Sequence, residues 1–229
     1  MRAAPLRALI LAAATILSCA SAGRVPGADR SGPPLFGMVY DDDNVPVAGA
    51  RVSVDGGDPV TSDVNGRFAL PAPSIGSHSL VVEKPLFETA RDGFDYQSAV
   101  QLLYVKLFSA RQLAARAEGA LVRRDLALAA EILERVLALA PDDIEARYAA
   151  AIVAYRSGRA AEARSLLEAL VREGCREPAI YLFLADIAQF NEKKNEAAAG
   201  YLKRSLDLRG DPDVERRLAE LERSGLALR

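Results

Sequence analysis

The sequence predicts two domains: a small antiparallel β-sandwich, followed by an all-α solenoid built from repeated helix pairs. Three observations support this fold class. Apolar and polar residues alternate in short runs between residues 34 and 88. From residue 110 onward, small and large side chains recur at a spacing of 34 residues. Before both regions, a short apolar run follows two arginines, which is typical of an export signal rather than of a folded element.

The composition narrows the classes of function. The chain has 229 residues, enough for two domains, and half of them are hydrophobic. Its 29 basic and 31 acidic residues give a net charge of -2, so there is no electrostatic reason to expect nucleic-acid binding. One histidine, His78, and two cysteines leave little material for a catalytic triad or a three-ligand metal site. We therefore expect no enzymatic activity, no cofactor and no metal.

Residues 1–18 have the pattern of a signal peptide. Arg2 and Arg7 precede the apolar run Ala8–Leu17, which is too short to span a bilayer but suits the hydrophobic region of a signal peptide. The run ends in Ile16-Leu17-Ser18-Cys19, which resembles the signal of bacterial lipoproteins, in which the cysteine is acylated and becomes the new N-terminus. This resemblance implies a lipid anchor on Cys19 in the bacterial cell envelope, at the outer membrane or on a periplasmic membrane face.

A second cleavage site leaves an alternative open. Ala20-Ser21-Ala22 has small residues at the positions that an ordinary signal peptidase requires. Cleavage after Ala22 would release a soluble periplasmic protein. Residues 19–33 are small, polar and interrupted by Gly and Pro, which predicts a flexible tether between an anchor and the first domain.

Residues 34–88 contain the alternating runs, such as Ala50–Val54 and Arg67–Leu70, with Asp- and Gly-rich turns between them. The order of the motifs resembles the carboxypeptidase regulatory-like (transthyretin-like) domain over about 50 residues. The matching segments are Gly37-Met38-Val39, Pro46–Val52, Thr61–Phe68 and His78–Val82. The resemblance implies a sandwich without catalysis of its own, with Gly49 and Gly66 in tight turns.

Two features of this domain have a possible chemical role. His78 lies in an alternating run, and we expect it to be a partly exposed strand residue. The acidic cluster Asp41-Asp42-Asp43-Asn44 carries oxygen ligands of the kind that bind Ca²⁺, but it lacks the spacing of a calcium loop. We expect a solvated turn there.

Three blocks, 110–143, 144–177 and 178–211, align without gaps. Alanine occupies the eighth, eleventh and twentieth slots of each block, and a large residue the twenty-fourth: these are Ala117, Ala120, Ala129, Leu133, Ala151, Ala154, Ala163, Leu167, Ala185, Ala188, Ala197 and Tyr201. The pattern resembles the tetratricopeptide repeat, in which small residues let helices A and B of each hairpin approach closely. Arg204 and Arg209 depart from that pattern, which suggests that the third repeat is the atypical outer one.

The segments that flank the repeats are also predicted to be helical. Tyr96–Leu107 reads as a helix within a connector over 95–109, either separate or continuous with the first repeat. Residues 212–229 begin with Asp211-Pro212, a helix start, and carry an apolar stripe that includes Val214 and Leu221. We expect this last helix to cap the array.

The resemblance implies that slots 2, 5, 9, 12 and 13 of each helix A line a concave groove. The residues in these slots are Glu145, Tyr148, Ile152, Tyr155 and Arg156 in the second repeat, and Ala179, Leu182, Asp186, Gln189 and Phe190 in the third. We expect the partner-binding residues to be Tyr148, Ile152, Tyr155, Arg156, Leu182, Asp186, Gln189 and Phe190. The aromatic rings are candidate anchors, and the alternative is that they pack against a neighbouring helix or the β domain. The Lys and Asn that clamp a C-terminal carboxylate in chaperone-binding repeats are absent.

These observations favour a non-enzymatic, membrane-anchored scaffold that binds a protein or peptide through the repeat groove. The alternative is a surface or periplasmic component that binds a glycan or peptide through the sandwich. Cys175 is expected to be a buried thiol, with an intermolecular disulfide as the alternative. The sequence leaves the oligomeric state open.

Overall fold

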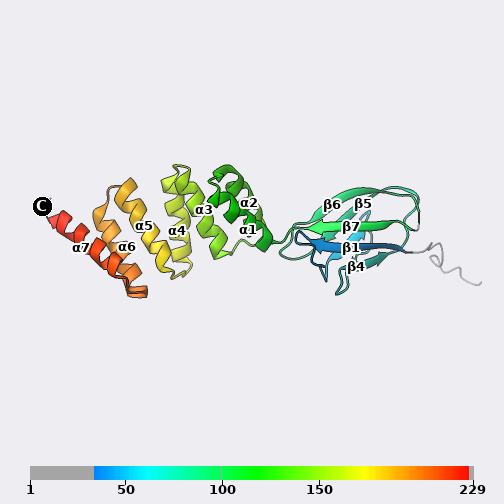
Figure 1. Cartoon of the computed structure of the whole chain (residues 1–229), viewed down its shortest axis with the longest axis horizontal. Helices are drawn as coiled ribbons and strands as arrows, with labels where there is room; N and C mark the ends of the chain where they lie inside the picture. Colours follow the sequence, from blue (N-terminus) through cyan, green and yellow to red (C-terminus); the bar gives the residue numbers. More distant parts are fainter. Residues whose placement is uncertain (1–33, 99, 227–229) are drawn as a thin grey trace, which may run out of the picture. The chain divides into compact units, whose positions relative to one another are not determined.

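The computed structural model describes residues 34–98 and 100–226 (Figure 1). The predicted signal peptide, Cys19, the site at Ala22 and the tether 19–33 lie outside the described residues. Within the described ranges, a strand-rich region precedes a helical one, which confirms the predicted fold class.

Two sheets form the N-terminal sandwich. The first has the strand order β4 (Arg67–Leu70), β1 (Leu35–Asp41), β7 (Leu102–Leu107), and the second has the order β3 (Val60–Thr61), β2 (Arg51–Val54), β5 (Gly76–Glu83), β6 (Ala90–Tyr96). All pairs are antiparallel except β1 and β7, which run parallel from Phe36↔Leu102 to Asp41↔Leu107. The sandwich is therefore largely antiparallel, as the sequence predicts, with one parallel pair in the first sheet.

One apolar core lies between the two sheets. Leu35, Val39, Val52 and Val82 are fully buried in it, each from a strand position whose neighbours point the other way. The buried hydroxyl of Ser62 donates to the Val47 carbonyl at 2.7 Å and accepts from the Ala50 amide at 2.9 Å. Because both contacts are made, this polar group is buried without a lost hydrogen bond.

The predicted helical connector over 95–109 is wrong. Residues 90–96 form β6 and residues 102–107 form β7, so the β domain extends to Leu107. Along β7, Leu103 and Val105 are buried while Leu102 and Tyr104 are exposed, which is the period of two expected for a strand. The exposed positions are themselves apolar, so the segment reads as a continuous apolar run in which helix and strand cannot be distinguished by periodicity.

The helices of the second region form successive hairpins (Figure 1). Their bounds are α1 Ala110–Val122, α2 Leu126–Leu139, α3 Ile144–Arg156, α4 Ala160–Arg172, α5 Pro178–Asp186 with the π-helical turn η1 Ile187–Asn191, α6 Asn195–Leu208 and α7 Pro212–Leu226. Local capping explains several starts, because the side chains of Ser109, Asp125 and Asp143 each accept a bond from a backbone amide in the first turn.

The first two repeats have the predicted packing, but the third is shifted by one residue. Ala129 and Ala163 are fully buried at the twentieth slot, whereas the buried alanine of the third repeat is Ala198 and not Ala197. In the same way, Leu202 is fully buried in place of Tyr201, which is only partly covered. The gap-free alignment is therefore wrong after the first helix of the third repeat.

The π-helical turn η1 supplies the extra residue. A π turn widens the helix by one residue relative to an α turn. The residues with positive φ in the three A-to-B turns show the same shift, because Arg124 and Gly158 are 34 residues apart and Lys193 follows after 35. With this insertion, the buried Ser205 takes the slot that the gap-free alignment gives to Arg204. That departure from the repeat pattern thus disappears.

Candidate partner-binding groove

The first helices of the hairpins, α1, α3 and α5, are called the A helices here. Between α1 and α3 lies an open hollow of about 590 Å³. Its lining residues are Glu118, Leu121, Val122, Arg124, Leu126, Ile152 and Arg156, and this set is called the groove hollow below. Four of these lining residues are aliphatic and three are charged.

Ile152 and Arg156, two of the predicted partner-binding residues, lie in the groove hollow. The Arg156 guanidinium has only a long contact of 3.5 Å between Nη1 and the Leu121 carbonyl, which holds it weakly. Val122 contributes a side chain that is 82% exposed. Leu121, Val122 and Glu118 occupy slots 12, 13 and 9 of the first repeat, so the slot rule locates them once it is applied to that repeat.

Tyr148 and Tyr155 pack between the second and third repeats. Both rings meet Phe183 of α5 edge-on, with centroid distances of 6.1 and 5.1 Å. Burial raises the pKa of Tyr148, and the nearby Asp186 carboxylate adds to this. Both tyrosines are only partly exposed. The structure therefore favours packing of these rings against the neighbouring helix over a role as exposed anchors for a partner.

The predicted residues of the third repeat face α7. Arg217 of α7 pairs with the Asp186 carboxylate at 2.7 Å, and its Nη2 donates to the side-chain oxygen Oε1 of Gln189 at 2.6 Å. Its guanidinium also lies 5.5 Å from the centre of the Phe190 ring, which is 56% exposed. Leu182 belongs to the apolar cluster that α7 completes. The chain itself therefore occupies this part of the predicted site.

Equivalent positions explain this contact. Arg217 is the sixth residue of α7, as Phe183 is the sixth residue of α5, and each contacts the preceding A helix. Sequence reasoning misses Arg217 because the stripe of α7 is defined by its apolar residues alone. The repeat slot that it shares with Phe183 is the signal that identifies it.

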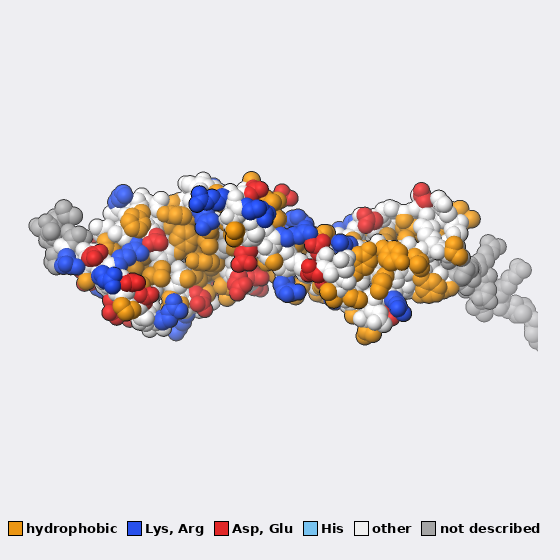
Figure 2. Space-filling model, viewed as in Figure 1, with side chains coloured by type: hydrophobic (Ala, Val, Ile, Leu, Met, Phe, Trp, Pro, Cys, Tyr) orange, Lys and Arg blue, Asp and Glu red, His pale blue; other side chains and the backbone are white. Residues whose placement is uncertain are grey.

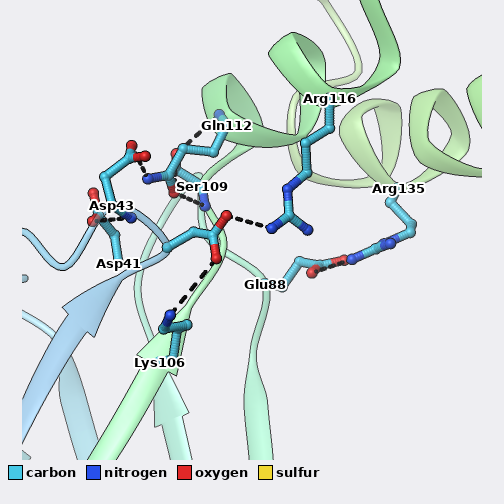
Figure 3. Close-up of polar contacts among 9 residues, drawn as sticks. Asp41, Asp43, Glu88, Lys106, Ser109, Gln112, Arg116 and Arg135 are labelled. Atoms are coloured by element: carbon cyan, nitrogen blue, oxygen red, sulfur yellow. Dashed lines mark hydrogen bonds and ion pairs between the residues drawn. The ribbon is translucent and has the colours of Figure 1, made fainter. Parts of the chain in front are cut away.

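The acidic cluster in the sandwich contacts the first hairpin (Figure 3). Asp42 pairs with Arg116, and Asp43 accepts a hydrogen bond of 2.6 Å from the Gln112 side chain. The cluster is a turn, as expected, in which Asp43 and Asn44 are exposed and Asp41 accepts from the Asp43 and Val45 amides. The contacts of Asp42 and Asp43 with helix α1 are not foreseen from the sequence. Across the described ranges, no group of three His, Cys, Asp or Glu side chains is arranged to hold a metal ion.

A second polar contact joins the same two regions. The Arg135 guanidinium of α2 binds both oxygens of Glu88, each at 2.8 Å (Figure 3). This hydrogen-bonded pair holds the pKa of Glu88 below its ordinary value. Backbone bonds from Glu88 to Phe108 and from Ala110 to Leu86, at 2.9 and 2.8 Å, lie beside it.

His78 has a structural environment. Its Nδ1 lies 2.6 Å from the Asp55 carboxylate and its Nε2 lies 2.7 Å from the Ser74 carbonyl. Both acceptors require an N–H donor, so the hydrogen bond to Asp55 and then the one to Ser74 raise the pKa of His78. The residue is partly exposed in strand β5, as the sequence predicts, while its side chain is 8% exposed because these two partners close around it. Both ring nitrogens are thus engaged in contacts within the sandwich.

Cys175 is only partly exposed and lies at the edge of the apolar cluster that joins the second and third repeats. It forms no disulfide with any cysteine in the described part of the chain. No helix within residues 34–98 and 100–226 is long and apolar enough to cross a membrane.

Two family matches agree with the two regions of the structure. Residues 34–102 match the family described as "Carboxypeptidase regulatory-like domain", and residues 120–187 match "Tetratricopeptide repeat". No curated protein matches the chain in sequence.

Solved structures with a similar fold are tetratricopeptide repeat proteins. One is the first tetratricopeptide repeat domain of Spaghetti (RPAP3), bound to an HSP90 peptide, which is 16% identical with a TM-score of 0.46. The match includes 50% of this chain and 91% of the RPAP3 chain. The Sgt2 domain from Aspergillus fumigatus is 17% identical, with 50% and 78% coverage and a TM-score of 0.44. An O-GlcNAc transferase from Thermobaculum terrenum is 24% identical, with 45% and 20% coverage and a TM-score of 0.42.

Proposed function

The chain joins a carboxypeptidase regulatory-like domain to tetratricopeptide repeats, and from this premise we propose that it is a non-enzymatic scaffold that binds a protein or peptide through its A-helix groove. The observation that carries the proposal is the groove hollow. It is left open by the chain, whereas the equivalent surface of the third repeat is covered by α7.

The groove hollow also indicates the chemistry of the partner. Val122 and Ile152 offer apolar surface for one aliphatic or aromatic side chain of the partner. Arg124 and Arg156 line the hollow, and among the described residues neither is paired with a carboxylate. An extended segment with an apolar anchor beside an acidic group therefore fits this surface. Such burial of a few side chains gives most of the affinity in many interfaces.

We further propose that the scaffold is held at a membrane of the bacterial envelope by acylation of Cys19. The support is the sequence Ile16-Leu17-Ser18-Cys19, which follows an apolar run of signal-peptide length. Metabolic labelling with a fatty acid tests this directly. Label is expected on the wild type and not on Cys19→Ala, and an unlabelled wild type would leave the soluble form cleaved after Ala22.

The groove is tested with Val122→Asp, which puts a carboxylate into the groove hollow at a side chain that is 82% exposed. Because the position is exposed, the fold should tolerate the change. Ile144→Asp is the matched control: Ile144 is exposed at the start of α3 and does not line the hollow. Both tagged variants are captured from detergent-solubilised membranes beside the wild type. A partner that is lost from Val122→Asp and kept by Ile144→Asp supports the proposal, and a partner retained equally by both would refute it.

A further inference from the structure

Three segments of the sandwich meet at one end: the start of β1 and two connections between strands. β1 starts at Leu35, which pairs with Leu70 at the end of β4. Phe36 pairs with Leu102 at the start of β7, and Gly76 at the start of β5 pairs with Tyr96 at the end of β6. The start of β1, the β4–β5 connection and the β6–β7 connection therefore lie together, at the end where the chain enters β1.

Each of these segments exposes large apolar side chains. Ile75 and Val100, in the two connections, are 81% and 88% exposed. Phe36 and Leu102, opposite each other on β1 and β7, are 48% and 54% exposed. These four residues are called the apolar end below. Tyr104 continues the same sheet face and is 62% exposed. Scattered apolar residues are normal on a protein surface, but a cluster drawn from three separate segments marks an interaction site.

The same segments carry few titratable side chains, and His78 is paired with Asp55. Residues 34–40, 68–82 and 96–105 contain no Asp, Glu, Lys or Arg. One basic side chain, Arg67, lines a shallow hollow beside Phe36 and Leu102, where a phospholipid headgroup phosphate could pair with it. Three acidic groups stand behind the apolar end. Asp95 accepts a hydrogen bond from Ser77, and Asp55 binds His78. Asp58 lies in the exposed turn after β2. These carboxylates limit how deeply the end can enter an apolar medium.

The opposite end of the sandwich is charged and already engaged. There Asp42 and Asp43 contact α1, and Lys106 lies 3.8 Å from Asp42. Figure 2 shows the contrast: hydrophobic side chains gather over β1 and β7, while acidic and basic side chains gather where the strands meet the helices. The sandwich thus has one charged end and one apolar end, at opposite ends of its strands. A domain surrounded by water on all sides has no need of this asymmetry.

We propose that the apolar end lies in the interface of a lipid bilayer, with Phe36, Ile75, Val100 and Leu102 inserted among the headgroups and upper acyl chains. A bilayer accepts uncharged loop tips with aliphatic and aromatic side chains at a depth of roughly 5–10 Å. The position in the chain gives the second argument. Residues 20–34 separate Cys19 from β1, and fifteen extended residues span at most about 50 Å, so a lipid on Cys19 keeps this end near the membrane.

The proposal draws on the Cys19 anchor only for delivery to the membrane, so its test replaces that anchor. Residues 34–229 contain all four buried apolar clusters and the contacts described above, and they lie within one compact unit. Circular dichroism of this piece checks that it is folded before it is used. A His-tag before residue 34 tethers it to phosphatidylcholine vesicles that carry a nickel-chelating lipid. The chain contains no tryptophan, so a single introduced Trp reports its own environment.

Val100→Trp places the probe at the apolar end. Val64→Trp is the matched control, since Val64 is 83% exposed in the turn before β4, at the opposite end of β1. On vesicles, Val100→Trp is expected to shift its emission to shorter wavelength and to be quenched by brominated acyl chains. Val64→Trp is expected to show neither effect. Adding Ile75→Asp to Val100→Trp is expected to abolish the shift, because it brings a carboxylate into the inserted surface.

Equal emission from the two Trp variants on vesicles would overturn the proposal, as would a shift that survives Ile75→Asp. A shift of Val100→Trp that appears without lipid, on addition of a second copy of the chain, would assign the apolar end to self-association and overturn it too. Failure of the fatty-acid label on Cys19, or of partner capture by the groove, leaves these readouts unchanged. The membrane contact of the apolar end, the Cys19 anchor and the partner-binding groove can therefore each be refuted without the other two.

Discussion

The one-residue shift in the third repeat makes a sharp prediction about two adjacent alanines. Ala198 is fully buried, and replacing it with Leu forces three extra carbon atoms into a packed site between α5 and α6. Such overpacking costs about 1–3 kcal/mol. Ala197→Leu adds the same atoms at a partly covered position that borders an open hollow, and a cost below about 0.5 kcal/mol is expected there.

Urea unfolding followed by circular dichroism measures the difference. The midpoint of Ala198→Leu should fall clearly below that of the wild type with an unchanged m-value, while Ala197→Leu should stay close to the wild type. A gap-free 34-residue register places Ala197 at the buried slot and predicts the opposite order. If Ala197→Leu is the more destabilised variant, the π-helical insertion is not part of the native structure.

Three further changes test other contacts. Glu88→Gln should lower the free energy of unfolding by about 1 kcal/mol at pH 7, a value that allows for solvent screening. Arg135 lowers the pKa of Glu88, so the wild type loses this contribution as Glu88 is protonated. In urea titrations, the difference between the two proteins should therefore disappear below pH 4.5. Arg217→Ala removes three contacts of α7 and should lower the local stability of α7 by about 1–2 kcal/mol. Amide hydrogen exchange should become faster in α7 and the preceding hairpin only, and an equal increase throughout the chain would contradict this. Gly66→Ala should lower the free energy of unfolding by more than about 2 kcal/mol in thermal unfolding, because φ is +74° and a Cβ would lie 2.3 Å from the Val39 carbonyl oxygen. Gly49→Ala is the control: its φ is also positive, but a Cβ there meets open space, so the loss should be smaller.

Sequence patterns predict the helical hairpins well because their small residues repeat at a fixed spacing. The shift in the third repeat escapes this reasoning for a chemical reason. Ala197 and Ala198 are both small, and Tyr201 and Leu202 are both large, so two registers satisfy the same pattern. Only the backbone, with the π turn at η1, distinguishes them.

The error at β7 has a different origin. Leu102 and Tyr104 are apolar although they face outward, which hides the alternation that marks a strand. The residues that misled the prediction are those of the exposed apolar face, and a surface that departs from a local rule in this way is often one with a function. Within the groove, Ile152 and Arg156 are predictable from repeat slots, whereas the cover provided by Arg217 depends on packing that no single-helix pattern encodes.

The extra residue in η1 is absorbed before the next helix of the groove series. α7 begins at Pro212, which is 34 residues after Pro178 begins α5, so the groove-forming series keeps its period while α6 behind it is displaced. The position of the A helices and the packing of the helices behind them are thus set separately in this array. A single extra residue in an A-to-B turn changes which side chains of the following helix are buried, and the next A helix still begins in phase.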